Sequence, residues 1–79
     1  MTDTVIHNTR VSYDEDDERV RAFVKHLKNI EMKEEFRNSY EKARHGSEDK
    51  RVYLSDSLGN EFTLECEGEH ICNLRLRGM

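Results

Sequence analysis

Apolar residues in the first half of the chain recur at helical spacing, but they change sides part-way along. The first stripe consists of Val20, Phe23, Val24 and Leu27, and the second of Met32, Phe36, Tyr40 and Ala43. At about 100° per residue, the two stripes lie on nearly opposite sides of one continuous helix. An unbroken helix would therefore meet two partners, whereas a break at residues 29–31 would turn both stripes toward one core. Asn29 suits a helix end or an N-cap, so we favour the break and predict a broken helix or helical hairpin over residues 14–45.

Local signals mark both ends of this helical region. Ser12 and Glu15 form a capping-box pattern, with Asp14 as a competing N-cap, so we expect the helix to begin between residues 13 and 15. At the other end Gly46 follows His45, which predicts a helix that ends with glycine in the left-handed conformation.

The segment before the helix carries a weaker pattern. Alternation over residues 4–12 would place Val5, His7, Thr9 and Val11 on one face of a strand. Polar residues interrupt it, and asparagine is depleted in strands. We expect residues 1–12 to form a weak strand or a disordered arm.

The pattern changes from helical to alternating in residues 50–77, where we predict a three-stranded antiparallel meander. Residues 56–60 are typical of a hairpin with a three-residue loop in which Gly59 is left-handed, and residues 67–69 can be interpreted as a second three-residue loop. The resulting pairs are Val52 with Leu64, Leu54 with Phe62, Phe62 with Leu74, Leu64 with Cys72, and Cys66 with His70. On the other face, Arg51 then lies opposite Glu65 and Glu61 opposite Arg75, which supports the register.

Together these elements predict a single α+β domain over residues 1–79. The meander has one apolar face, formed by Val52, Leu54, Phe62, Leu64, Leu74 and Leu76. The helices are the elements available to cover it.

Composition suggests that the core is small. Of 79 residues 34% are hydrophobic and 38% are charged, with a net charge of −4. Apolar surface is scarce for a chain of this length, which favours self-association as a homodimer. We find neither a signal-peptide pattern nor an apolar run of membrane-spanning length, so we expect a cytoplasmic protein with no membrane partner and with reduced cysteines.

A cluster of soft ligands lies near the second loop. In the predicted register Cys66, His70 and Cys72 share a face, which makes them weak candidates for a zinc site. Their spacing matches no standard zinc motif, and two cysteines that behave as small core residues explain the pattern better. A disulfide is disfavoured because the two cysteines are diagonal in this register. Neighbouring glutamates would raise the thiol pKa and so disfavour a thiolate nucleophile. We expect no catalytic residue, and we also expect no cofactor.

The outer face of the meander is the better candidate for function. It carries the partner-binding candidates Arg51, Tyr53, Ile71, Asn73, Arg75 and Arg77. Arginine and tyrosine are typical of recognition surfaces. Because Glu61 and Glu65 occupy the same face, a protein partner fits it better than a nucleic acid, although an ordinary solvated sheet face explains these residues equally well.

The predicted order of elements, a strand, helices and three antiparallel strands, is similar in outline to the RelE and ParE group of bacterial toxins. That resemblance implies cleavage of ribosome-bound messenger RNA or poisoning of gyrase. The ribonucleases of the group rely on basic and aromatic clusters on the sheet, whereas here Arg51, Tyr53, Arg75 and Arg77 are interspersed with acids.

The sequence therefore predicts a small non-enzymatic binding or regulatory protein that acts through macromolecular contacts, as a homodimer. The alternatives are a protein that binds or cleaves nucleic acid and a small domain stabilised by a metal.

Overall fold

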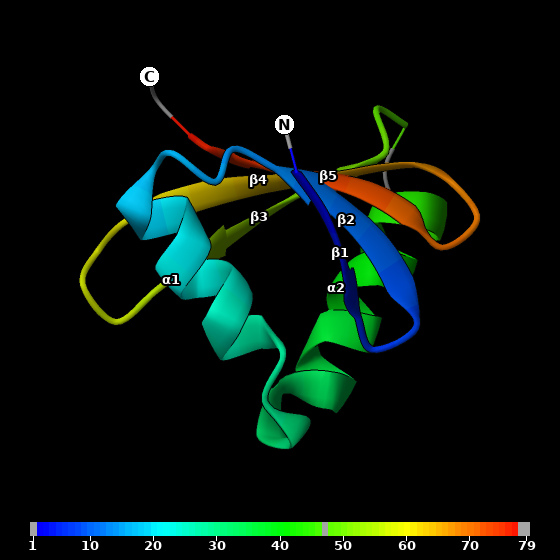
Figure 1. Ribbon diagram of the computed structural model, residues 1–79. Helices are drawn as coiled ribbons and strands as arrows, with labels where there is room; N and C mark the ends of the chain where they lie inside the picture. The colour runs from blue at the N-terminus through cyan, green and yellow to red at the C-terminus, as the bar shows by residue number, and fades with distance from the viewer. Residues whose placement is uncertain (1, 47, 78–79) are drawn as a thin grey trace.

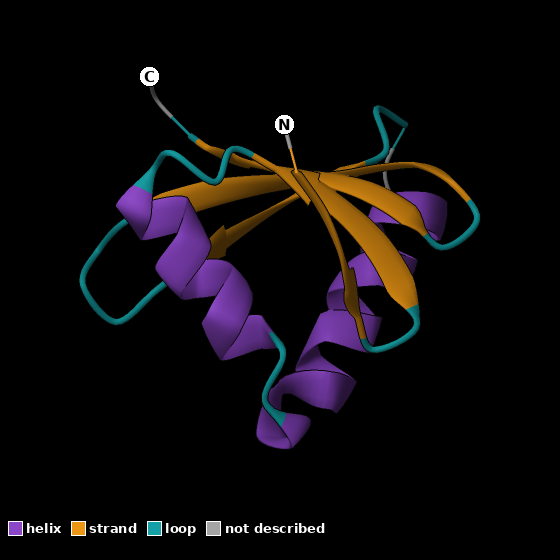
Figure 2. Cartoon of the chain, viewed as in Figure 1, coloured by secondary structure: helices purple, strands orange, loops and turns teal. Residues whose placement is uncertain are grey.

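The computed structural model describes residues 2–46 and 48–77. The two ends of the predicted domain, residues 1, 78 and 79, therefore lie outside the described residues. The elements in chain order are β1 (Thr2–Ile6), β2 (Thr9–Tyr13), α1 (Glu18–Leu27), the 3₁₀ turn η1 (Ile30–Met32), α2 (Lys33–His45), β3 (Arg51–Ser55), β4 (Glu61–Gly68) and β5 (Ile71–Leu76). Within this part of the chain the strands form one five-stranded sheet in the order β1-β2-β5-β4-β3. Both helices lie against the same face of the sheet (Figure 1, Figure 2), which confirms the α+β class.

The helical region is broken where the apolar stripe changes sides. Asn29 has an extended backbone (φ −62°, ψ 142°) between α1 and η1. The break turns both stripes inward: the first is wholly buried, and Phe36, Tyr40 and Ala43 of the second are buried with Met32 packed at their edge. The two helices form a V that opens toward the sheet and closes at η1 (Figure 1). One chain thus buries both stripes. A continuous helix would have needed a second protomer to cover one of them, and that argument for dimerisation no longer applies.

The predicted helix start was wrong. Ser12 belongs to β2, and its hydroxyl donates to Asp3 Oδ1 across the β1–β2 pair at 2.5 Å. Because β2 pairs with β1 up to Tyr13, the chain cannot turn into a helix at residues 13–15. The helix instead begins at Glu18, with Asp17 as N-cap accepting the Arg19 backbone N–H at 2.9 Å.

The end of α2 at His45 is as predicted, but Gly46 is not left-handed, since its φ is −105°. Glycine fits this position closely, because a Cβ would make a tight contact of 3.0 Å with the carbonyl oxygen of Lys42. The backbone N–H of Gly46 donates to that same oxygen and closes the last turn.

The weak single strand and the disordered arm were both wrong, because the N-terminal segment is a hairpin. His7 and Asn8, which dilute the strand pattern, form its turn with φ values of 46° and 72°. Two consecutive left-handed residues are what a tight two-residue hairpin turn requires. As a result Val5 faces away from the core and Val11 faces into it, which separates residues that the sequence placed on one face.

The first meander hairpin has the predicted register. Val52 pairs with Leu64 and Leu54 with Phe62, and Gly59 has a φ of 87°. In the loop the Asp56 backbone N–H donates to the Asn60 carbonyl at 3.1 Å.

The second meander hairpin is shifted by two residues from its predicted register. Leu64 pairs with Leu74 rather than with Cys72, and the ladder is irregular between Glu65 and Gly68. The chain reverses through a tighter turn in which His70 is left-handed, with a φ of 57°. An even-numbered shift leaves each side chain on its predicted face but gives it a different partner.

The core lies between the two helices and the sheet. Phe23 of α1 stacks on Phe62 of β4, with ring centroids 4.1 Å apart and planes 2° from parallel. Phe36, Leu64 and Leu74 fill the adjoining space and are almost completely buried. Because both helices lie on this side, no helix of the described residues covers the opposite face of the five strands.

Candidate interaction face

We call the uncovered side of the sheet the open face. From the strand registers, its side chains are Asp3, Val5, Arg10, Ser12, Arg51, Tyr53, Ser55, Glu61, Thr63, Glu65, Ile71, Asn73, Arg75 and, just beyond β5, Arg77. All six predicted partner-binding residues lie on it. Figure 2 shows no helix on this side of the sheet.

Three arginines of the open face are paired with glutamates. Glu65 Oε2 accepts a hydrogen bond from Arg51 Nε at 2.7 Å, as the predicted Arg51–Glu65 pair required. Its other oxygen, Oε1, lies 3.8 Å from Arg75 Nη2. The hydrogen bond that Arg51 donates to Glu65 raises the pKa of the Arg51 guanidinium above its ordinary value. The predicted Glu61–Arg75 pair is wrong, because the two-residue shift brings Arg77 to Glu61, with Nη1 and Oε2 3.4 Å apart.

Tyr53 is part of the same network. The Arg77 guanidinium carbon lies 4.2 Å from the centroid of its ring, within the range of a cation–π contact. Tyr53 as a whole remains 52% exposed. Thr63 lies between Tyr53 and Arg75 in the strand pairing and is buried by its neighbours, so it supports the open face without being available for contact.

A second group of contact residues comes from pairing that the sequence did not reveal. β1 and β2 place Val5 beside Arg10, and the parallel β2–β5 pair places Arg10 beside Ile71. Val5 is 64% exposed and Ile71 52% exposed. Among the described residues the Arg10 side chain has no ion-pair partner. Asn73 is half-buried near this row, beside Ser12 and Glu65. In the sequence, the His7-Asn8 dipeptide was the turn signal that could have revealed the β1–β2 hairpin and with it these contact residues.

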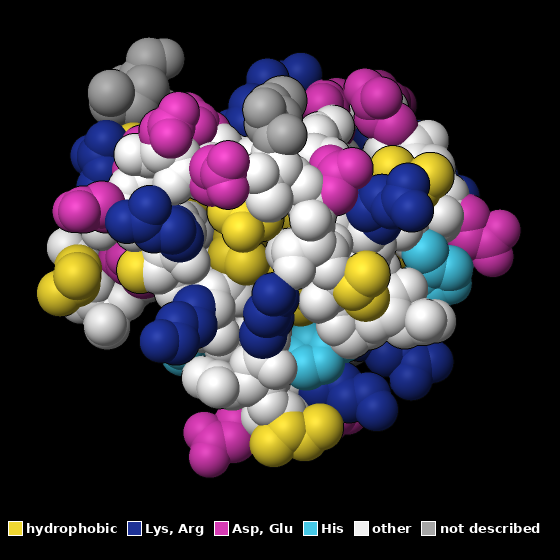
Figure 3. All heavy atoms as spheres, viewed as in Figure 1, with side chains coloured by type: hydrophobic (Ala, Val, Ile, Leu, Met, Phe, Trp, Pro, Cys, Tyr) yellow, Lys and Arg dark blue, Asp and Glu magenta, His cyan; other side chains and the backbone are white. Residues whose placement is uncertain are grey.

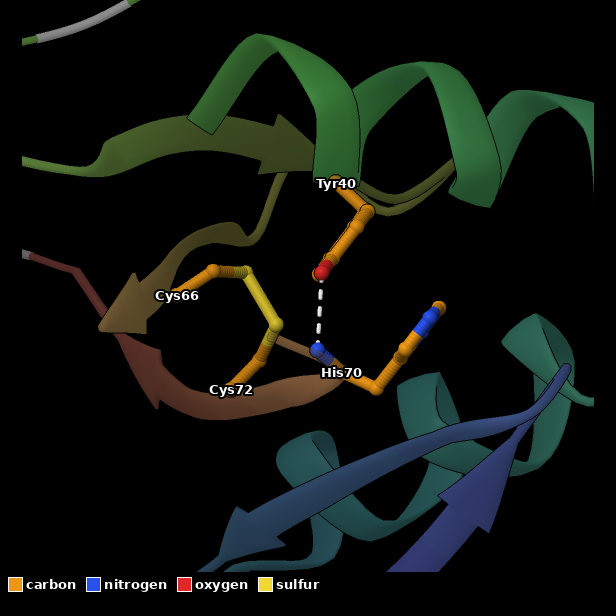
Figure 4. The surroundings of a disulfide bond; sticks show 4 residues. All are labelled: Tyr40, Cys66, His70 and Cys72. Carbon is orange, nitrogen blue, oxygen red and sulfur yellow. Dashed lines mark hydrogen bonds between the residues drawn. A yellow bond between two sulfur atoms is a disulfide. The ribbon is translucent and has the colours of Figure 1, made fainter. Parts of the chain in front are cut away.

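Both cysteines are buried in the core, as predicted, but the predictions that they are reduced and diagonal to each other were wrong. Cys66 and Cys72 form a disulfide (Figure 4), whereas reduced thiols were expected. The irregular ladder on β4 changes the pairing, so the cysteines are opposite rather than diagonal, with Cα atoms 4.0 Å apart. Both sulfur atoms are thereby occupied, and neither is available as a zinc ligand or nucleophile. The third weak metal candidate, His70, lies in the turn, where its backbone N–H donates to the Tyr40 hydroxyl at 2.7 Å (Figure 4).

A groove of about 610 Å³ opens at the β3 edge, between the two helices. Its polar lining includes His26, Glu35, Ser39 and Asp56. The Asp56 carboxylate is engaged in its own hairpin loop, where it accepts the Leu58 and Asn60 backbone N–H groups. The Ser39 hydroxyl donates to the Glu35 backbone carbonyl at 3.0 Å. Within the described residues, no hydrogen bond joins the side chains of these four residues to one another, as an acid–base relay would require.

Among residues 2–46 and 48–77, neither helix has the length and apolar character needed to cross a membrane. Comparison of the chain with protein-family models, curated proteins and solved structures gives no match.

Proposed function

We propose that the chain is a small non-enzymatic binding protein that contacts a protein partner through its open face. One observation carries this proposal: both helices cover the same side of the sheet, and the other side exposes Val5, Tyr53 and Ile71 beside arginines. Exposed apolar side chains mixed with arginine and tyrosine are typical of the centre of a protein interface.

The charge balance favours a protein over a nucleic acid. Arg51 and Arg75 are held by Glu65, and Arg77 is held by Glu61. A phosphate backbone is bound by cations that are free to replace counterions, and these three already have carboxylate partners. RNA cleavage, which the layout resemblance implied, would need the same free cations and is the weaker candidate.

The row Val5–Arg10–Ile71 indicates the chemistry of the partner. A guanidinium without a partner among the described residues lies between two exposed apolar side chains. A matching surface would present a carboxylate flanked by apolar groups, because burying Arg10 without a counter-charge would be costly. We therefore propose an acidic partner surface with apolar residues around the acid.

Self-association as a homodimer stays a proposal that rests on composition alone. The low apolar content favours it, but both helical stripes are buried within one chain. Molar mass by sedimentation equilibrium tests it directly, and a monomer across the micromolar range would contradict it.

A cytoplasmic location likewise stays a proposal. The disulfide is an argument against it, because a strongly reducing compartment keeps thiols free.

The binding proposal can be tested with matched charge substitutions. Val5→Asp and Ile71→Asp place a carboxylate on the open face, and Leu58→Asp places one on the β3–β4 loop, where Leu58 is 84% exposed. Proteins retained by the immobilised wild-type chain should be lost with the first two variants and kept with the third. Tyr53→Ala, Arg75→Ala and Arg77→Ala should also weaken retention while scarcely changing the melting temperature. Equal retention by all variants would contradict the proposal.

A further inference from the structure

A separate hollow of about 470 Å³ lies on the helix side, at the end of the sheet. Three segments distant in sequence enclose it: the β1–β2 turn with His7 and Asn8, the outer side of α2 with Lys33 and Arg37, and the β4–β5 turn with His70. Figure 3 shows cyan histidine side chains beside dark-blue lysine and arginine side chains at the lower right of that view, near the two turns and α2.

The lining of this hollow is cationic although the chain is acidic overall. Lys33 and Arg37 are one helical turn apart on α2, so they project from the same side. Within the described residues neither has an ion-pair partner. The one acid in the lining, Glu41, directs its carboxylate to the next turn of α2, where Oε2 lies 3.4 Å from His45 Nε2. The Glu41 carboxylate is therefore directed away from the two cations, which line one side of a partly open hollow. Glu31 and Glu34 lie beside the same two cations in the adjoining depression.

The turns that close the hollow are held in uncommon conformations. His7, Asn8 and His70 account for three of the four described non-glycine residues with positive φ. His70 is held at two points: its backbone N–H bonds the Tyr40 hydroxyl, and its ring stacks on the Tyr40 ring at 5.4 Å. Left-handed non-glycine residues gather preferentially at ligand sites, where the surrounding structure fixes them.

From this arrangement we propose that the hollow binds a phosphate group of a small molecule. A guanidinium can bond two phosphate oxygens at once, an ammonium adds a point charge, and the His70 imidazole can donate an N–H to a remaining oxygen. The volume is within the range of small-ligand pockets. Glu34 and Glu69, next to Lys33 and His70 in the sequence, place negative charge at the rim, which disfavours an extended polyanion such as a nucleic acid.

The test is calorimetric titration of the whole chain with inorganic phosphate and with pyrophosphate. Each probe should bind, and the double variant Lys33→Ala/Arg37→Ala should raise the dissociation constant by more than about tenfold. The matched control Lys25→Ala/Lys28→Ala removes the same charge from α1 and its end, and it should bind as the wild type does. His70→Asn, which tolerates the left-handed backbone but lacks the imidazole, should weaken binding by a smaller factor.

Amide chemical shifts locate the probe. Pyrophosphate should shift the resonances of Asn8 and His70 and leave those of β3 unchanged. Three results would overturn the proposal: no binding of either probe, equal weakening by the two double variants, or tighter binding of a mixed-sequence oligonucleotide than of pyrophosphate. The open-face variants Tyr53→Ala and Arg77→Ala, which add no charge near the two turns, should bind pyrophosphate normally, so failure of the protein-binding proposal is distinguishable from failure of this one.

Discussion

His7 Nε2 lies 2.7 Å from the backbone carbonyl oxygen of Leu27. A carbonyl only accepts, so Nε2 is the donor. The contact joins the turn of the N-terminal hairpin to the last residue of α1 and satisfies a carbonyl at a helix end, where no further turn supplies a donor. The His7 ring also lies 6.0 Å from that of Phe36, across the break between the helices. A single side chain therefore ties β1 and β2 to the point where the helical region bends.

Replacing His7 tests whether this contact stabilises the fold. His7→Asn keeps a residue that tolerates the left-handed backbone but removes the ring that reaches Leu27. We expect the free energy of unfolding to fall by about 1 kcal/mol, the net value of one hydrogen bond. Urea denaturation measures it. His26→Ala, at an exposed position on α1, should change stability by less than about 0.5 kcal/mol. An equal effect of both substitutions would show that the contact is not specific.

The errors in the sequence interpretation of the fold share a physical cause. Two hairpin turns contain left-handed residues that are not glycine, namely His7-Asn8 and His70, whereas Gly46 and Gly68 lack a positive φ. Turn assignment from glycine positions therefore succeeded at Gly59 and failed at the other turns. The break at Asn29 could be predicted because helical periodicity is a local property.

The candidate site was partly predictable for a related reason. Side chains on β3 and β5 keep their face under an even-numbered register shift, so the sequence placed Tyr53, Ile71 and Arg75 on the face where the structure has them. Their role in partner binding stays a prediction. Val5 and Arg10 were missed because they join the open face through the β2–β5 pair, which links residues far apart in the chain. No local pattern encodes such a pairing.

The disulfide predicts a stability that depends on reductant. Cys66 and Cys72 are six positions apart and both are buried. A loop of this length contributes about 2 kcal/mol in the chain-entropy model. Dithiothreitol should therefore lower the urea midpoint of the wild type and leave that of Cys66→Ala/Cys72→Ala unchanged. Mass spectrometry after alkylation verifies the redox state, and a wild-type midpoint that does not respond to reduction would contradict the prediction.

Asp56 predicts a loss of stability in acid. Its pKa lies below the ordinary value of 3.8, chiefly because the Asn60 side chain donates to Oδ2 at 3.0 Å, with added backbone donors. A lowered pKa in the folded state means that the ionised carboxylate stabilises the fold above pH 3.8, and this contribution is lost as the pH falls through the lower folded-state pKa. Unfolding of Asp56→Asn, followed from about pH 5 to about pH 2, should depend less on pH than that of the wild type. Ser57→Ala, in the same loop, should keep the wild-type dependence.

Gly59 and Gly68 provide a matched test of the backbone conformation in the two meander turns. Gly59 has a φ of 87°, and an added Cβ would have no atom within 4 Å. Gly59→Ala should therefore destabilise the fold only through the strain of a left-handed alanine. That cost is about 1 kcal/mol. Gly68 lacks a positive φ, and a Cβ there would meet Ile71 Cδ1 at an ordinary 3.6 Å. Gly68→Ala should therefore change the free energy of unfolding by less than about 0.5 kcal/mol. Gly59→Asn should recover part of the loss, because asparagine tolerates this conformation. If Gly68→Ala proved the more damaging substitution in urea denaturation, the left-handed residue of the second turn would have to be Gly68 rather than His70, and the two-residue shift in register would be wrong.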